Sequence, residues 1–152
     1  MIVLVDPKDA RAVRNKDNIL ACYELLINQK KPEEAAESYV VPNYIQHNPL
    51  MNDGRKGLSD FFAKIAAEHA AARVVVHKII AVGDSVWAHV NFLNMFTDDP
   101  DDTGVAVVDM WIMNAEGECI EHWDVLQVVG DPSNAAPWLA PNLLPANTNG
   151  MF

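Results

Sequence analysis

Apolar residues recur with a helical period in the first half of the chain. Between residues 16 and 29 they fall at positions i, i+3, i+4, i+7 and i+8, which places Ile19, Cys22, Tyr23, Leu26 and Ile27 on one helical stripe. Asp6 and Pro7 are suited to begin this helix, as N-cap and first helical residue. A short second helix is expected over 32–39 and a third over 56–71.

The second half of the chain changes to the alternation of β-strands. Runs rich in Val and Ile, separated by turn residues, predict four strands over 73–82, 85–97, 104–114 and 118–129. A short extended segment is also expected over 43–48. Successive strands joined by hairpins favour an antiparallel meander. We therefore expect an α+β fold, with three N-terminal helices packed on one face of a strongly curved, mostly antiparallel sheet around an internal pocket.

Length and charge suggest one domain and exclude several partners. A chain of 152 residues suits a single domain spanning 1–152, with its core over about 15–129 and a Pro-rich tail over 130–152. The net charge of −10 speaks against nucleic acid and against an anionic membrane surface. No signal peptide or membrane span is recognisable, so a cytoplasmic location is expected, with Cys22 and Cys119 as free thiols. The tail residues expected to dock elsewhere are Trp138, Leu139, Leu143 and Leu144.

Polar residues in three of the predicted strands can gather on one face of the sheet. Side chains alternate between the two faces of a strand, and this alternation groups His89, Asn91, Asp109, His122 and Asp124. A carboxylate in an apolar pocket has a raised pKa, and a nearby imidazole titrates close to neutrality. Such a set can remove a proton next to a carbonyl group and return one to the developing oxyanion.

Other interpretations of this polar set stay open. A buried Asp–His pair is often only a satisfied structural hydrogen bond. His89, His122 and Asp124 could in principle bind a metal ion, but they lack the close spacing of common ligand motifs, so neither metal nor cofactor is expected. The strand over 104–114 is apolar on both faces, and one set of helices covers only one of them. A homodimer formed through the outer sheet face is therefore expected.

Several segments resemble the SnoaL-like polyketide cyclase branch of the NTF2-like superfamily, over about residues 15–129. The matching strings are Asn18–Gln29, Tyr44–Pro49 (Tyr-Ile-Gln-His-Asn-Pro) with Gly54 and Gly57, Val107–Trp111, and Gly117–Val125 with its Glu-His-Trp-Asp core. The resemblance implies a cone of three helices on a curved sheet, commonly dimeric. It also implies a metal-free aldol cyclisation with an Asp as general acid/base, and Asp124 is the closest position, with Asp109 as rival.

The same resemblance extends the list of candidate residues. It places the segment His47-Asn48-Pro49 beside the mouth of the cavity, and it adds His47 as a further catalytic candidate beside His122 and His89. The residues expected to contact the substrate are Tyr23, Tyr44, Asn91, Trp111 and Trp123.

Three classes of function fit these patterns. The first is acid/base chemistry, an aldol-type cyclisation or an isomerisation, on a small apolar carbonyl compound. The second is a non-catalytic protein that binds a small molecule or acts as an accessory to another enzyme. The third is a structural interaction module in which Trp111, Met113 and Leu126 fill the hollow.

Overall fold

The computed structural model describes residues 1–130, 147 and 149–152, and it has three α-helices and a six-stranded mixed sheet. The elements along the chain are β1 (Ile2–Val5), α1 (Ala10–Tyr23), the π-helical turn η1 (Glu24–Asn28), α2 (Pro32–Tyr39), β2 (Val40–Gln46), α3 (Gly54–Glu68), β3 (Arg73–Val82), β4 (Ser85–Leu93), β5 (Val105–Met113) and β6 (Cys119–Val128). The predicted docking of the tail residues from Trp138 to Leu144 lies outside the described residues.

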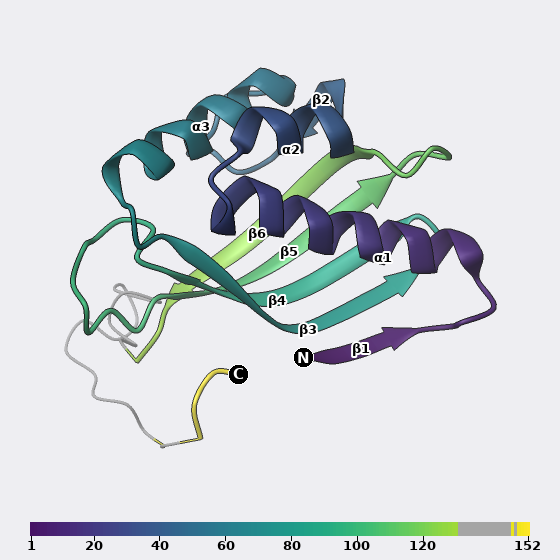
Figure 1. Ribbon diagram of the computed structural model, residues 1–152. Helices are drawn as coiled ribbons and strands as arrows, with labels where there is room; N and C mark the ends of the chain where they lie inside the picture. Colours follow the sequence, from purple (N-terminus) through teal and green to yellow (C-terminus); the bar gives the residue numbers. More distant parts are fainter. Residues whose placement is uncertain (131–146, 148) are drawn as a thin grey trace.

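The strand order in the sheet is β1-β3-β4-β5-β6-β2 (Figure 1). The four central strands form the expected antiparallel meander. At the edges, β1 pairs parallel with β3 and β2 pairs parallel with β6. One detail of the predicted order is wrong, because a strand precedes the helices. The short extended segment expected over 43–48 corresponds to β2, which lies between α2 and α3 and begins earlier, at Val40.

Helix α1 begins three residues later than the Asp6-Pro7 pair predicts. The side chain of Asp9, not Asp6, accepts the backbone N–H of Ala12 at 3.0 Å and caps the helix. Asp6 instead accepts the N–H of Lys8 in the turn before it. The helix continues into the π-helical turn η1, and Tyr23 stands at the junction of the two. Inserted π turns of this kind are frequent at functional sites.

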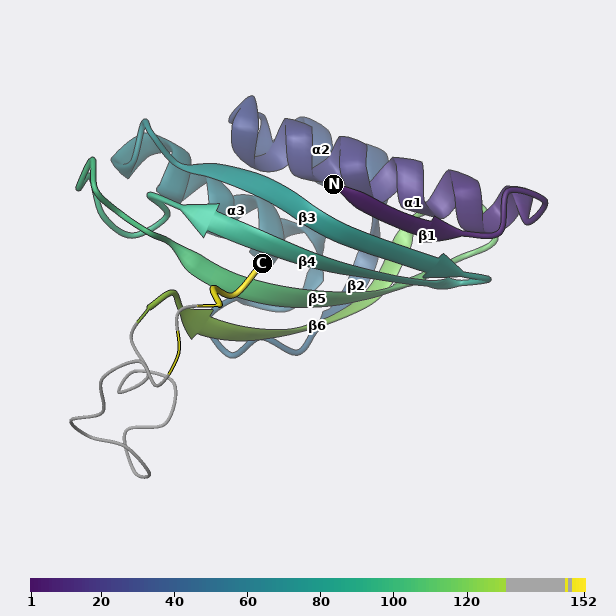
Figure 2. The same ribbon diagram turned by 90° about the horizontal axis from the view of Figure 1, so that it is seen from below.

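The helices lie on one face of the sheet, as Figure 1 shows, and Figure 2 shows the strands in front with the helices behind them. Apolar side chains from both layers form the core between them, among them Ile19 and Leu26 from the helical layer and Val86, Val90 and Val107 from the sheet. None of the helices in the described part of the chain is long and apolar enough to cross a membrane.

Gly57 allows the loop between β2 and α3 to pack against the start of α3. A Cβ atom at this position would lie 2.0 Å from the carbonyl oxygen of Asn52, which is backbone and cannot move aside cheaply. The same loop carries Asn48, so this close approach helps to fix a residue of the candidate site described below.

Gly57→Ala should destabilise the protein by about 1–3 kcal/mol because the added methyl group overpacks a buried contact. The usual effect of this change inside a helix is the opposite, since alanine is the better helix former. Urea unfolding at neutral pH measures the difference. Lys64→Ala, on the exposed side of the same helix, is the control and should stay within about 0.5 kcal/mol.

Candidate active site

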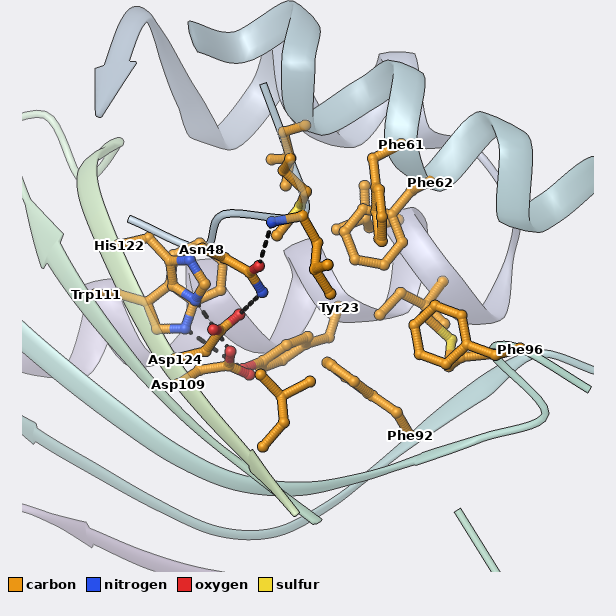
Figure 3. Close-up of a pocket in the computed structure, with 17 residues that line it drawn as sticks. Tyr23, Asn48, Phe61, Phe62, Phe92, Phe96, Asp109, Trp111, His122 and Asp124 are labelled. Atoms are coloured by element: carbon orange, nitrogen blue, oxygen red, sulfur yellow. Dashed lines mark hydrogen bonds and ion pairs between the residues drawn. The ribbon is translucent and has the colours of Figure 1, made fainter. Parts of the chain in front are cut away.

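Two neighbouring strands place four functional side chains on the helix-facing side of the sheet. In the register of β5 and β6, Asp109 stands opposite Asp124 and Trp111 stands opposite His122. Alternation along β5 also turns Val107 and Met113 inward, as predicted, and all of these β5 residues are buried. The four side chains meet at one end of a pocket (Figure 3).

Asp109 is at the centre of this group and is only 2% exposed. Its Oδ2 accepts the phenolic hydrogen of Tyr23, and its Oδ1 lies 3.0 Å from Nε2 of His122, itself 3% exposed. The indole N–H of Trp111 donates to the oxygen of Tyr23 at 3.3 Å. Burial, and then the charge of Asp109, hold the pKa of Tyr23 well above its ordinary value, so the phenol remains a donor.

Asp124 is the more accessible of the two carboxylates. Its Oδ2 accepts a hydrogen bond of 2.7 Å from the side-chain amide of Asn48. Burial raises the pKa of Asp124; the Asn48 hydrogen bond and His122 oppose this shift, and Asp109 adds to it. No partner for its other oxygen, Oδ1, is found among the described residues. Asp124 therefore presents a basic oxygen to the pocket.

The rest of the pocket is apolar and largely aromatic. Its wall is formed by Leu26 and Ile27 of η1, by Phe61 and Phe62 of α3, and by side chains from β4 and the loops that follow β2 and β4, including Leu50, Met51, Phe92, Met95 and Phe96. In Figure 3 the polar cluster lies at one end and the labelled phenylalanines lie at the other, with Tyr23 between them. A ligand in this pocket would hold its apolar part among the rings and present a polar group to Asp109 and Asp124.

The pocket is nearly closed in this conformation. Its empty volume is about 500 Å³ when the open solvent at its mouth is included. Within that volume, the centre of a water molecule can occupy only about 30 Å³ without overlapping a side chain. That clear space holds about one water molecule. A larger ligand therefore requires side chains of the lining to move.

Comparisons with known proteins agree with this geometry. Residues 4–122 match the family model of the SnoaL-like domain. The chain belongs to the SnoaL-like family. The sequence matches no curated protein.

Solved structures with the same fold come from several bacteria. A candidate polyketide cyclase of Bacillus cereus ATCC 10987 is 18% identical with a TM-score of 0.70, over 83% of this chain and 84% of that one. A candidate SnoaL-like polyketide cyclase of Jannaschia sp. CCS1 is 15% identical with a TM-score of 0.63, over 81% and 92%. TsrD of Streptomyces laurentii is 19% identical with a TM-score of 0.61, over 89% and 97%. At these identities the likeness concerns the fold.

The structure of this SnoaL-like protein brings together five of the ten predicted site residues: Tyr23, Asp109, Trp111, His122 and Asp124. Tyr44 is buried behind them, with its ring stacked on His122 at 6.5 Å, and burial raises its pKa. It does not line the pocket.

The expectation that His89 and Asn91 face the pocket is wrong. Ala88, not His89, stands opposite Asp109, so His89 and Asn91 belong to the outer side of the sheet. The His89 ring stacks on Phe152 at 5.2 Å, and the Asn91 amide donates to the carbonyl of Thr103. Burial, Lys78 and His77 lower the pKa of His89, which has no contact with either pocket carboxylate.

His47 and Trp123 also lie away from the pocket. Trp123 alternates with His122 and Asp124 and so faces outward. The His47 ring stacks on Trp123 at 4.4 Å, nearly parallel to it, and its Nε2 lies 2.8 Å from Glu121. His47 is therefore a residue of the outer edge between β2 and β6, and not of the cavity mouth.

Sequence reasoning missed two polar residues of the SnoaL-like site. Asn48 binds Asp124, and the side-chain oxygen of Gln46 lies 3.1 Å from Nδ1 of His122. Both follow from the parallel pairing of β2 with β6, in which Gln46 stands beside His122. The Tyr-Ile-Gln-His-Asn-Pro string contained both residues, but only the pairing shows which of its side chains turn inward.

Three residues of the site offer ligand atoms that could approach one metal ion. The ligand atoms of Asp109, His122 and Asp124 all lie within 4.8 Å of one another. The Asp109 and His122 atoms concerned already contact each other at 3.0 Å, so an ion between them would replace that contact. Chemistry without a metal remains a prediction.

The raised pKa of Asp124 gives a signed prediction for stability. Ionising this carboxyl costs more in the folded protein than in the unfolded chain. The carboxyl therefore makes its full favourable contribution to folding stability below its ordinary pKa of 3.8. That contribution is lost as the pH rises through the raised pKa that Asp124 has in the folded protein. Asp124→Asn should gain stability relative to the unmutated protein as the pH rises from about 3 to about 7.

Urea unfolding at a series of pH values measures this change in the free energy of unfolding. Asp101→Asn, the same chemical change at an exposed position, is the control and should show no such trend. A gap between Asp124→Asn and the unmutated protein that stays constant with pH would contradict the assigned role of burial.

Proposed function

We propose that this protein is an acid/base catalyst that acts without a metal on a small, apolar carbonyl compound held in the pocket. The observation that carries the proposal is the half-buried Asp124, which presents a free carboxylate oxygen beside the Asp109–His122 pair at the end of an aromatic cavity. The described lining contains two carboxylates and an imidazole but no Lys or Arg, so it favours an uncharged substrate over an anionic one.

The proposed reaction begins with Asp124. Its carboxylate removes a proton from the carbon next to a carbonyl group, and the C–H electron pair moves into the resulting enolate. The Asp109–His122 pair then supplies a proton. If that proton returns to a different carbon, the product is an isomer. If the enolate carbon first attacks a second carbonyl of the same molecule, a C–C bond forms and the proton goes to the new alkoxide, which is an aldol-type cyclisation.

Family membership supports this proposal. Two of the structural relatives are themselves candidate polyketide cyclases, although the likeness at 15–18% identity concerns the fold. A fold alone does not determine a function. The choice between isomerisation and cyclisation depends on the substrate.

Proton abstraction can be tested before the natural substrate is known. Monocyclic and bicyclic ketones of graded size are incubated with the protein in D₂O, and deuterium at the carbon next to the carbonyl is followed by NMR. We expect exchange above background for at least one ketone. Asp124→Asn should lower that rate by about 10²–10⁴-fold, the usual contribution of a general base.

Two controls make this assay decisive. Asp101→Asn, at an exposed site on the loop between β4 and β5, should exchange at the rate of the unmutated protein. Dialysis against EDTA should also leave the rate unchanged, whereas a loss restored by added Zn²⁺ would overturn metal-free chemistry. Saturable ligand binding with no exchange for any ketone would favour the non-catalytic binding protein.

We also propose that the outer sheet face joins two copies of this chain. Helices cover the inner face only, and large apolar side chains of the outer face are exposed, including Trp87 at 49% and Val125 at 60%. These positions continue across the sheet, because Trp87 stands beside Ile80 on β3 and Met110 on β5. Burial of such a surface against a second copy would remove this apolar area from water.

Trp87→Glu should shift the protein from dimer to monomer, because it places a charge in the middle of the proposed interface. Light scattering coupled to size-exclusion chromatography measures the mass. Leu50→Glu is the matched control, since it adds the same charge at an exposed apolar residue away from the sheet. A monomeric unmutated protein at micromolar concentration would refute the proposal.

A further inference from the structure

The side chain of Gln46 bridges the strand edge and the candidate site. Its Oε1 lies 2.9 Å from the backbone N–H of Asn48 and 3.1 Å from Nδ1 of His122. Its Nε2 donates to the hydroxyl oxygen of Tyr44 at 2.8 Å. Parallel pairing of β2 with β6 sets Gln46 beside His122, so backbone geometry keeps this contact in place.

These contacts determine which way the Gln46 amide points. A backbone N–H can only donate, so the Gln46 atom that faces Asn48 must be the carbonyl oxygen and not the amide nitrogen. The same oxygen faces Nδ1 of His122 and has no hydrogen to give. Nδ1 must therefore carry a hydrogen and donate it to Gln46.

This assignment limits the proton content of the pair formed by His122 and Asp109. With Nδ1 protonated, His122 is either neutral with a lone pair on Nε2, or an imidazolium with a second hydrogen there. In the first case Asp109 must hold the proton that lies between Nε2 and Oδ1; in the second case His122 holds it. Either way, one proton lies between the two groups, and the two forms differ by its movement across a 3.0 Å contact.

We infer that Gln46 is a positioning residue that keeps a hydrogen on Nδ1 of His122, so that Nε2 and Asp109 hold one shared proton beside Asp124. This inference deepens the proposed function and, for catalysis, rests on it: the shared proton is the one that the pair gives to the substrate. The donation leaves the pair with one proton fewer, and the proton that Asp124 has taken restores it when the product leaves.

Loss of the residue that holds a catalytic histidine in one tautomer has a known effect on the reaction rate. In Ser-His-Asp triads, the residue that holds the histidine tautomer contributes about 10⁴-fold to kcat although it never touches the substrate. Gln46 has the same relation to His122, with a neutral amide in place of a carboxylate. Other ionisable groups around His122 are Tyr23 from α1, Tyr44 from β2, Asp109 from β5 and Asp124 from β6.

The test is ¹⁵N NMR of the full chain labelled in histidine, with the His122 signals assigned by their loss in His122→Gln. We expect Nδ1 of His122 to carry a hydrogen near neutral pH in the unmutated protein. A neutral imidazole with its hydrogen on Nε2 alone would overturn the inference. This measurement needs no substrate, so it stands or fails independently of the deuterium-exchange assay.

Two variants separate positioning from simple structural support. Gln46→Met removes the acceptor, and the hydrogen of neutral His122 should move to Nε2, with the maximum exchange rate lowered at least about tenfold and the half-saturating ketone concentration nearly unchanged. Gln46→Glu keeps an oxygen acceptor for the Asn48 N–H and for Nδ1 of His122, and it adds a negative charge. The doubly protonated form of His122 should therefore persist to higher pH in this variant than in the unmutated protein. This variant keeps the accepted bonds and remains informative if Gln46→Met does not fold.

A structural role predicts a different result. In that case the hydrogen stays on Nδ1 in Gln46→Met, the His122 titration does not move in Gln46→Glu, and activity falls only as far as the folded fraction falls. Any of these three outcomes contradicts the inference. If the NMR results hold but no ketone exchanges, the proposed function fails while the positioning of His122 stands.

Discussion

A carboxylate removed from water must have hydrogen-bond donors around it, and in this protein the requirement falls on Asp109. Tyr23 reaches it from the end of α1, and His122 reaches it from β6. Trp111 supports the same contact through the oxygen of Tyr23. The helical layer and two strands are therefore tied together at one point. Asn48 and Gln46 extend this group to β2 and its following loop, so the polar network reaches the edge of the sheet.

Much of the architecture could be predicted because it follows from local patterns. The tight turn between β5 and β6 leaves few possible registers, and alternation alone then placed Asp109, Trp111, His122 and Asp124 on one face. The connection between β4 and β5 is longer and constrains the register less. A shift of one residue exchanges the two faces of a strand, and this explains why the prediction that His89 faces the pocket is wrong.

Parallel pairing at the sheet edge could not be predicted in the same way. Val40–Gln46 reaches β6 from a distant part of the chain, and no hairpin fixes its register. The pairing decides that Gln46 and Asn48 turn toward the site while His47 turns toward Trp123. Sequence composition could not separate these neighbours, because histidine and tryptophan stack as readily on an outer surface as they do in a pocket.

The small clear volume of the cavity bears on how the protein would choose among ligands. If most molecules in solution have the narrow form, the apparent affinity of any ligand falls by the fraction of molecules that are open. The lining includes Met51 and Met95, whose flexible thioethers adapt to ligands of different shape. The apolar end of the pocket would then discriminate weakly between ligands of similar size. Selection among ligands would depend mainly on the carbonyl group of the ligand, because the hydrogen-bonded cluster around Asp109 is rigid and tolerates little variation in the position of that group.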